Sequence, residues 1–346
     1  MATTYAIPDG RVAMAATLYT GNNSTQTISN AVNGVSMQPD FVWVKGRSGA
    51  TDHALYDSVR GTTKDLVSNA TSAETTQATG LTAFGSTGFT VGALAKMNTS
   101  AATYVGWQWK GGGTPVSNTS GSITSSVSAN TTAGFSVVTY TGTGANATVG
   151  HGLGVAPSMI ICKNRGSVTA WTVGFTYSGF TWTTDYFQLN DTGAKRTDGA
   201  GTVFSAVPTS TTFAIGSNFS SSNFVAYCFA PVAGYSAFGS YTGNGSSDGP
   251  FIYTGFRPRF ILVKNASRAI PWEIFDSSRN TSNIANSYLL PNASNAEASD
   301  NIEGLDFLSN GVKIRGVSTS YNNHTSGDTY IYMAFAENPF KYSLAR

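Results

Sequence analysis

The stretch that decides the fold is Pro39-Asp40-Phe41-Val42-Trp43-Val44-Lys45. Proline has no backbone N–H to donate, so it suits the start of a strand better than its interior. The apolar run between the proline and the lysine is short enough for a strand that is buried on both faces. The same pattern returns as Pro157-Ser158-Met159-Ile160-Ile161-Cys162-Lys163 and as Pro258-Arg259-Phe260-Ile261-Leu262-Val263-Lys264. Recurrence at wide spacing marks an internal repeat, so the sequence predicts a central strand that is built three times.

Further motifs surround these strands in one order. Tyr-Thr-Gly precedes each central strand, at residues 19–21, 140–142 and 241–243. A motif with an acid and an arginine follows the first and third strands, at 53–60 and 272–279, and the middle copy keeps only Trp171-Thr172-Val173. Hairpins with a turn glycine come next at 84–91 and 307–314, while the middle copy at 207–215 lacks that glycine, so its turn should differ. An aromatic strand closes each copy, at 104–109, 224–229 and 330–335.

These short strands, broken by Gly, Asn, Ser and Thr, favour a β-sandwich over helices. We therefore predict an all-β fold of three tandem β-sandwich repeats, jelly-roll-like and roughly 100 residues each. The predicted boundaries are an N-terminal lead-in at 1–14, repeats at 15–110, 134–231 and 232–346, and a Gly/Ser/Thr linker at 111–133. We expect the linker to supply an edge strand at most, and no core. The sequence leaves open whether the repeats form a ring or a string.

The composition argues against several classes of protein. The formal net charge is +2 and the lysines and arginines are scattered, whereas a nucleic-acid surface needs clustered positive charge. No apolar run reaches the length of a membrane span, and residues 1–10 lack the basic start and apolar core of a signal peptide. We therefore expect no nucleic-acid partner, no membrane insertion, and assembly in a cytoplasm.

The sequence contains no persuasive catalytic constellation. The histidines His53, His151 and His324 fall at different places in the three copies, and no metal-ligand spacing or cofactor motif is present. We therefore expect a protein that is not an enzyme and that holds no cofactor and no metal.

The repeated acids have an ordinary interpretation. Asp57 with Arg60, and Asp276 with Arg279, should form local ion pairs or turn caps. A glycosidase needs two carboxylates across a cleft. The pairs Asp57 with Glu74 and Asp276 with Glu297 could be proposed, but the middle copy lacks both acids.

Two other sets of side chains also have ordinary interpretations. The lysines that end the central strands, Lys45, Lys163 and Lys264, should extend past the edge of the core to solvent. Cys162 and Cys228 should be small buried side chains in strands of the middle copy. A disulfide between the two remains open, although reducing assembly would oppose it.

One aromatic stretch has no counterpart in the other copies. It runs from Tyr177 to Tyr186 and contains Phe180 and Trp182. Exposed aromatic side chains stack on sugars and dock on proteins. Tyr177, Phe180, Trp182 and Tyr186 are therefore the candidate binding residues.

Several of these motifs carry a resemblance to a known family. Residues 39–45, Asp57-Ser58-Val59-Arg60-Gly61, Gly88-Phe89-Thr90-Val91-Gly92 and Tyr104-Val105-Gly106-Trp107-Gln108-Trp109-Lys110 resemble a repeated domain of unknown function. That domain recurs in virion structural, tail fibre-like proteins of tailed bacteriophages, especially marine and cyanobacterial phages. The resemblance is closest over residues 15–113 and extends more weakly to the second and third copies. It implies no catalytic residues, and the second copy departs most because it lacks the Asp-Ser-x-Arg motif.

The resemblance leads to an expectation about function. We expect a non-enzymatic virion protein, foremost a tail-associated fibre or receptor-binding component whose partners are other virion proteins and a host surface glycan or protein. A capsid decoration protein is the alternative, and a polysaccharide depolymerase is the weakest one. The assembly would be a homotrimer, or one chain whose three units imitate a trimer.

Overall fold

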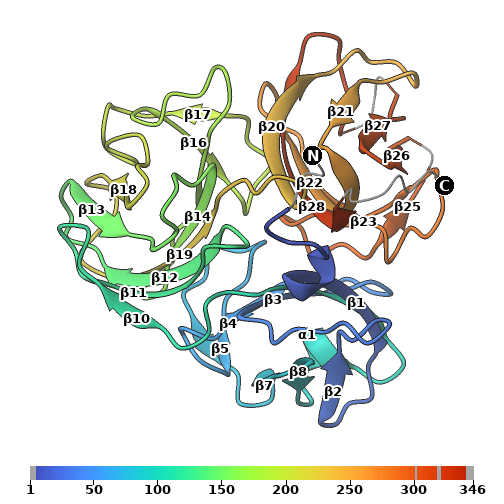
Figure 1. Ribbon diagram of the computed structural model, residues 1–346, viewed down its shortest axis with the longest axis horizontal. Helices are drawn as coiled ribbons and strands as arrows, with labels where there is room; N and C mark the ends of the chain where they lie inside the picture. The colour runs from blue at the N-terminus through green and yellow to red at the C-terminus, as the bar shows by residue number, and fades with distance from the viewer. Residues whose placement is uncertain (1–4, 301, 318–320, 340–346) are drawn as a thin grey trace.

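The computed structural model (Figure 1) describes residues 5–300, 302–317 and 321–339, and they form an almost entirely β structure. The helical elements of this part of the chain are a 3-10 turn, Gly10–Val12, and one turn of helix, α1 (Ala95–Asn98). The prediction of an all-β fold is therefore confirmed.

Three sets of four antiparallel strands share one strand order, and each set defines a unit. The first unit contains β1 (Met14–Thr20), β9 (Thr103–Trp109), β3 (Phe41–Gly46) and β4 (Ala54–Asp57) in that order across the sheet. The second contains β12 (Phe135–Thr141), β19 (Asn223–Phe229), β14 (Met159–Asn164) and β15 (Thr172–Phe175). The third contains β20 (Ser236–Thr242), β28 (Thr329–Pro339), β22 (Phe256–Asn265) and β23 (Trp272–Asp276). The strands with the Pro–Lys pattern, β3, β14 and β22, each have two neighbours in the sheet.

A smaller layer completes each sandwich. In the first unit it is β2 (Gln26–Ser29), β8 (Gly88–Val91) and β7 (Leu81–Gly85), and in the third it is β21 (Phe251–Tyr253), β27 (Gly311–Ile314) and β26 (Leu305–Leu308). In the second unit β13 (Ala147–Gly150) pairs with β18 (Thr212–Ile215), and only a single bridge from Ala206 to Ala214 stands where the other units have a third strand. The expected difference in the middle hairpin is therefore present.

Short strands flank the main sheets. The pairs are β5 (Lys64–Asp65) with β6 (Thr75–Thr76), and β24 (Ser287–Tyr288) with β25 (Ala298–Ser299); β16 (Asp185–Gln188) and β17 (Arg196–Thr197) extend the second sheet beyond β15. The segment 111–133, expected to be a linker without core, extends the other edge of that sheet through β10 (Val116–Asn118) and β11 (Ser125–Asn130). Val127 on β11 is only 2% exposed. Small polar residues do not prevent backbone pairing, and one well-placed valine was enough to give this strand a buried face.

The central strands of the first two units alternate between two cores. Phe41 and Trp43 point to a cluster that all three units share, while Val42 and Val44 point to the core of the first sandwich. In the second unit Met159 and Ile161 point to the shared cluster, and Ile160 and Cys162 to the sandwich core of that unit. Phe260 and Leu262 enter the shared cluster from the third unit, whose own sandwich core is continuous with it.

The shared cluster is closed by aromatic contacts between units. Trp109 lies 5.4 Å from Phe260, 5.8 Å from Phe335 and 6.2 Å from Phe229, measured between ring centroids. Each of these three phenylalanines belongs to the second or third unit, so one tryptophan of the first unit touches both others. Figure 1 shows the resulting shape, three lobes around a common centre. The units therefore form a ring.

The N-terminal lead-in packs on this ring. Ile7 is 2% exposed and belongs to the shared cluster. Gly10 approaches the backbone of β28 so closely that a Cβ there would lie 2.3 Å from the carbonyl oxygen of Ala336. From Tyr5 onward the lead-in is therefore attached to the third unit of its own chain. Residues 1–4 of the lead-in lie outside the described residues.

No helix in the described part of the chain has the length and apolar character needed to cross a membrane.

Buried lysines join each unit to the next. The Nζ of Lys163 donates to Thr71 O at 3.2 Å, that of Lys45 to Ser294 O at 3.3 Å, and that of Lys264 to Thr192 O at 2.8 Å. The second unit thus donates to the first, the first to the third, and the third to the second. All three lysines are fully buried, and burial lowers the pKa of Lys45 and Lys163 to about 8 and that of Lys264 to about 7. The expectation that they reach solvent is wrong, because ring closure places a neighbouring backbone at the end of each central strand.

Ring N–H groups follow the same cycle. Trp171 Nε1 donates to Val67 O at 2.8 Å, and Trp272 Nε1 donates to Gln188 O at 2.9 Å. The third contact is made by His53, whose Nε2 lies 2.9 Å from Leu290 O. His53 also accepts a hydrogen bond from Trp43 Nε1 at its Nδ1, so Nε2 carries the proton and donates to the carbonyl. His53 thus has the same role as Trp171 and Trp272 in the other copies, which is to donate a ring N–H to a backbone carbonyl of the next unit.

The buried aspartates complete two of the three interfaces. Tyr227 OH donates to Asp57 Oδ2 at 2.8 Å, and Trp107 Nε1 donates to Asp276 Oδ2 at 3.0 Å. By strand register, the acid position of the second unit is Phe175 and the donor position of the third unit is Met333. Where the acid is missing, the donor opposite it is missing as well, so neither partner is left buried and unpaired.

The hydrogen bond from Tyr227 to Asp57 gives a test of this ring. Tyr227→Phe removes a donor to a buried carboxylate, and we expect it to lower the free energy of unfolding by about 1.5–3 kcal/mol. Tyr235→Phe is the matched control, because Tyr235 is also fully buried but its hydroxyl has no hydrogen-bond partner. Urea denaturation of the two variants and the unchanged protein measures the difference. Equal losses in both variants would contradict the assigned role of Asp57.

Candidate functional site

The repeated acid and arginine form a buried ion-pair network that crosses between units. Arg60 Nε lies 2.5 Å from Asp57 Oδ2, and Arg60 Nη1 lies 3.0 Å from Glu74 Oε2. Arg165 of the second unit pairs with Glu74 through two hydrogen bonds, at 2.8 and 2.9 Å. The prediction of a local ion pair is therefore confirmed for Asp57, and the network extends further than predicted.

The interface between the first and third units repeats this network. Arg279 lies 2.6 Å from Asp276 and 3.0 Å from Glu297, and Arg47 of the first unit binds Glu297 with two hydrogen bonds. The arginines hold the pKa of Glu297 below its usual value against the opposing effect of burial, as they do for Glu74. The carboxylates considered as a glycosidase pair are thus each held by arginines. The lowered pKa of Glu74 and of Glu297 is the opposite of what a general acid needs.

Two of the histidines, His53 and His151, and both cysteines are buried structural groups. His151 is fully buried, its pKa is lowered by burial, and its Nε2 lies 3.2 Å from Thr209 O. Cys162 and Cys228 are free buried thiols, so the disulfide left open by the sequence is not formed. Among residues 5–300, 302–317 and 321–339, no three His, Cys, Asp or Glu side chains are arranged to hold a metal ion.

The structure separates the four candidate binding residues. Trp182 is only 4% exposed, packs edge-to-face on Phe204 and donates from Nε1 to Thr176, so the expectation that it is exposed is wrong. Glycine at position 174 leaves the space that its ring fills. Tyr177 and Phe180 are half-buried and pack against the shared cluster. Tyr186 lines a pocket.

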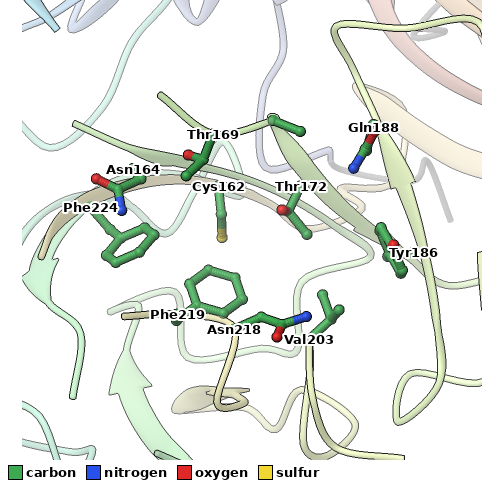
Figure 2. Close-up of a pocket in the computed structure, with 11 residues that line it drawn as sticks. Cys162, Asn164, Thr169, Thr172, Tyr186, Gln188, Val203, Asn218, Phe219 and Phe224 are labelled. Carbon is green, nitrogen blue, oxygen red and sulfur yellow. The ribbon is translucent and has the colours of Figure 1, made fainter. Parts of the chain in front are cut away.

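This pocket, here called the unit-2 pocket, has a volume of about 160 Å³ and lies between the main sheet of the second unit and the loops that cover it. Its buried members include Cys162, Phe219 and Phe224, and its exposed members are Thr169 and Asn218. Figure 2 shows the Cys162 thiol pointing into the space above Phe219. The arrangement is an apolar floor that opens to solvent through a polar rim.

Three hydrogen-bonding side chains form one wall of the unit-2 pocket. Thr172 on β15 is directly opposite Gln188 on β16, and Tyr186 is two residues from Gln188 on the same face of that strand. Within the described residues the side chains of all three make no hydrogen bond, and they are half-buried. They are available to a ligand.

Sequence reasoning identified Tyr186 but missed its two neighbours. The signal that could have identified them is a difference between the copies. Gln188 aligns with Val67 and Leu290, because the carbonyls of all three accept the repeated inter-unit hydrogen bond. The polar side chain of Gln188 thus stands where the other units hold an apolar one.

The third unit contains a buried acid that no arginine neutralises. Glu273 occupies the register position of Thr172, is 1% exposed, and has no hydrogen-bond partner at either carboxylate oxygen. Burial, together with the neighbouring Glu303 and Asp300, raises the pKa of Glu273 well above its usual value. Burial also raises the pKa of Glu303, to about 7. The fold therefore favours the neutral, protonated form of Glu273.

Comparison with known proteins places this all-β, three-lobed chain in a family. Residues 12–339 match the family described as a domain of unknown function, DUF7483. Because the match covers nearly the whole chain, the protein belongs to this family. No curated protein matches the chain, and no solved structure matches it.

The buried acid predicts how stability depends on pH. The folded state binds the proton of Glu273 more tightly than the unfolded chain does, so stability falls as pH rises above the ordinary glutamate pKa of about 4.5. Glu273→Gln should therefore raise the melting temperature at pH 8 and leave it nearly unchanged at pH 4.5, with a gain at pH 8 of about 1–3 kcal/mol.

Glu297→Gln is the control of opposite sign, because the pKa of Glu297 is lowered by its two arginines. It should destabilise the protein at pH 8 and do so less at low pH. Differential scanning fluorimetry from pH 4.5 to 8 compares the two variants. An equal effect of Glu273→Gln at both ends of the range would show that the acid is not held neutral.

Proposed function

We propose that this chain is a non-enzymatic structural protein of a bacteriophage virion, tail-associated, which contacts the host surface. The observation that carries the proposal is the contrast between a repeated framework and a pocket whose wall residues Thr172 and Gln188 are not repeated. Lysines, ring N–H groups and two buried aspartates hold the three units together at corresponding positions. The wall of the unit-2 pocket instead carries Thr172 and Gln188, which differ from their counterparts in the other two units. A rigid ring that presents one distinct recess suits a receptor-binding component.

The resemblance of residues 39–45 and 104–110 to tail fibre-like virion proteins supports the same proposal. Its partners would be other virion proteins and a host surface glycan or protein, and it would be assembled in the host cytoplasm. One chain with three lobes would take the place that a homotrimer takes in other assemblies.

A capsid decoration protein is the second candidate, and the ring favours it. Three lobes around one centre (Figure 1) would fit a threefold or quasi-threefold position of a shell without any oligomerisation. The two candidates differ in how many copies each particle carries.

Quantitative mass spectrometry of purified particles tests the proposal. We expect a ratio of this chain to the major capsid protein of about a few per cent, because a tail carries few copies. A ratio near one, or a simple fraction such as a third, would contradict the tail proposal and indicate a capsid decoration protein. Absence of the chain from particles would overturn the virion proposal altogether.

A further inference from the structure

We propose that the unit-2 pocket binds a single neutral sugar residue. The inference deepens the proposed function, because it names the ligand class and the place where the ring would meet a host surface glycan. It depends on the chemistry of the wall, the floor and the size of the pocket.

The wall is suited to neighbouring hydroxyl groups. Cys162, Thr172 and Gln188 stand opposite one another across β14, β15 and β16. Directly opposite residues in antiparallel strands have Cβ atoms about 4.5–5.5 Å apart. The Thr172 hydroxyl, the Gln188 amide and the Tyr186 hydroxyl therefore form a patch of unused donors and acceptors. An amide and two hydroxyls can each donate and accept, as the vicinal hydroxyls of a sugar do.

The floor is suited to the apolar face of a sugar ring. Phe219 and Phe224 lie within the pocket with their ring centroids 5.1 Å apart, and both are buried. The thiol of Cys162 points into the same space (Figure 2) and is un-ionised, because burial raises its pKa to about 12. A sugar needs this combination of an apolar surface beneath the ring and hydrogen-bonding groups at its edge.

The uncharged lining and the small volume of the pocket restrict the class of ligand further. None of the residues that line the pocket is an Asp, Glu, Lys, Arg or His. An acidic sugar would therefore enter without a counter-charge and would lose hydration. The volume of about 160 Å³ is well below the roughly 300–1,000 Å³ of sites for drug-sized molecules, so the pocket accommodates about one ring.

Two of the three wall residues, Thr172 and Gln188, are specific to the second unit. Thr172 stands at the register position of Ala54 in the first unit and Glu273 in the third. Gln188 stands at the position of Val67 and Leu290. The first unit therefore shows that this fold accommodates alanine at the position of Thr172 and valine at the position of Gln188.

The test is binding of free neutral sugars to the whole chain. The probes are glucose, galactose, mannose and N-acetylglucosamine, with glucuronic acid and sialic acid as charged comparisons, measured by ligand-observed NMR. We expect at least one neutral sugar to bind with a Kd of about 1–10 mM, as suits one ring, and the acidic sugars to bind at least tenfold more weakly.

Three variants assign the binding to the pocket. Gln188→Val and Thr172→Ala introduce side chains found in the first unit and should each weaken binding several-fold. Ala170→Trp, at the half-exposed edge of the pocket, should abolish it. Gln38→Val, at an exposed site outside the pocket, is the control and should bind normally. Melting temperatures show that each variant is folded.

Three results would overturn the inference. The first is no binding of any neutral sugar at 50 mM, a concentration at least about fivefold above the expected Kd. The second is binding that survives in Ala170→Trp, and the third is equal binding of neutral and acidic sugars. The proposed function is tested apart from this, by competition of the purified chain with particles for adsorption to host cells. Competition that persists in Ala170→Trp would contradict the sugar site while leaving the receptor-binding role in place.

Discussion

The rest of the structure depends on the alternation of the three central strands. On β3 the larger side chains face the centre of the ring and the smaller ones face the sandwich, as Trp43 and Val44 illustrate, and β14 alternates between the same two sides. Each main sheet therefore has two buried faces, and a unit that folded alone would expose its central face to water. Burial of a large aromatic side chain contributes about 1.5–3 kcal/mol. The shared aromatic cluster around Trp109 thus makes ring closure part of folding.

Several buried or partly buried charges lie where the units meet. Lys163, Arg165 and Arg60 act at one interface, and Lys45, Arg47 and Arg279 act at the next. Buried charges are costly unless they are paired and hydrogen-bonded, so they favour one register of the units over others. The interface between the third and second units keeps the lysine and the tryptophan but replaces the acid and its donor by Phe175 and Met333. The two kinds of interface show that a hydrogen-bonded pair and an apolar pair can occupy the same position.

Much of the fold could be predicted from the sequence, because strand periodicity and turn chemistry are local. The central strands, both glycine hairpins and the divergent middle turn follow from patterns such as Pro39 to Lys45. Ring closure could not be predicted in this way. Lys45 and Trp182 were expected at the surface because their neighbours in sequence give no sign of Ser294 or of the space left by glycine at 174. The sequence points to the candidate site only through Tyr186. Nothing in the sequence near Thr172 or Gln188 indicates that strand pairing places them opposite each other.

The central claim, that three units fold as one ring, is tested most directly by native-state hydrogen exchange followed by mass spectrometry of peptides. Peptides that cover β3, β14 and β22 report on the first, second and third units in one sample. If the shared cluster and the inter-unit contacts govern folding, all three strands exchange through one opening with the same free energy and the same denaturant dependence. Three different opening free energies, with one unit exchanging while the others stay protected, would contradict the account.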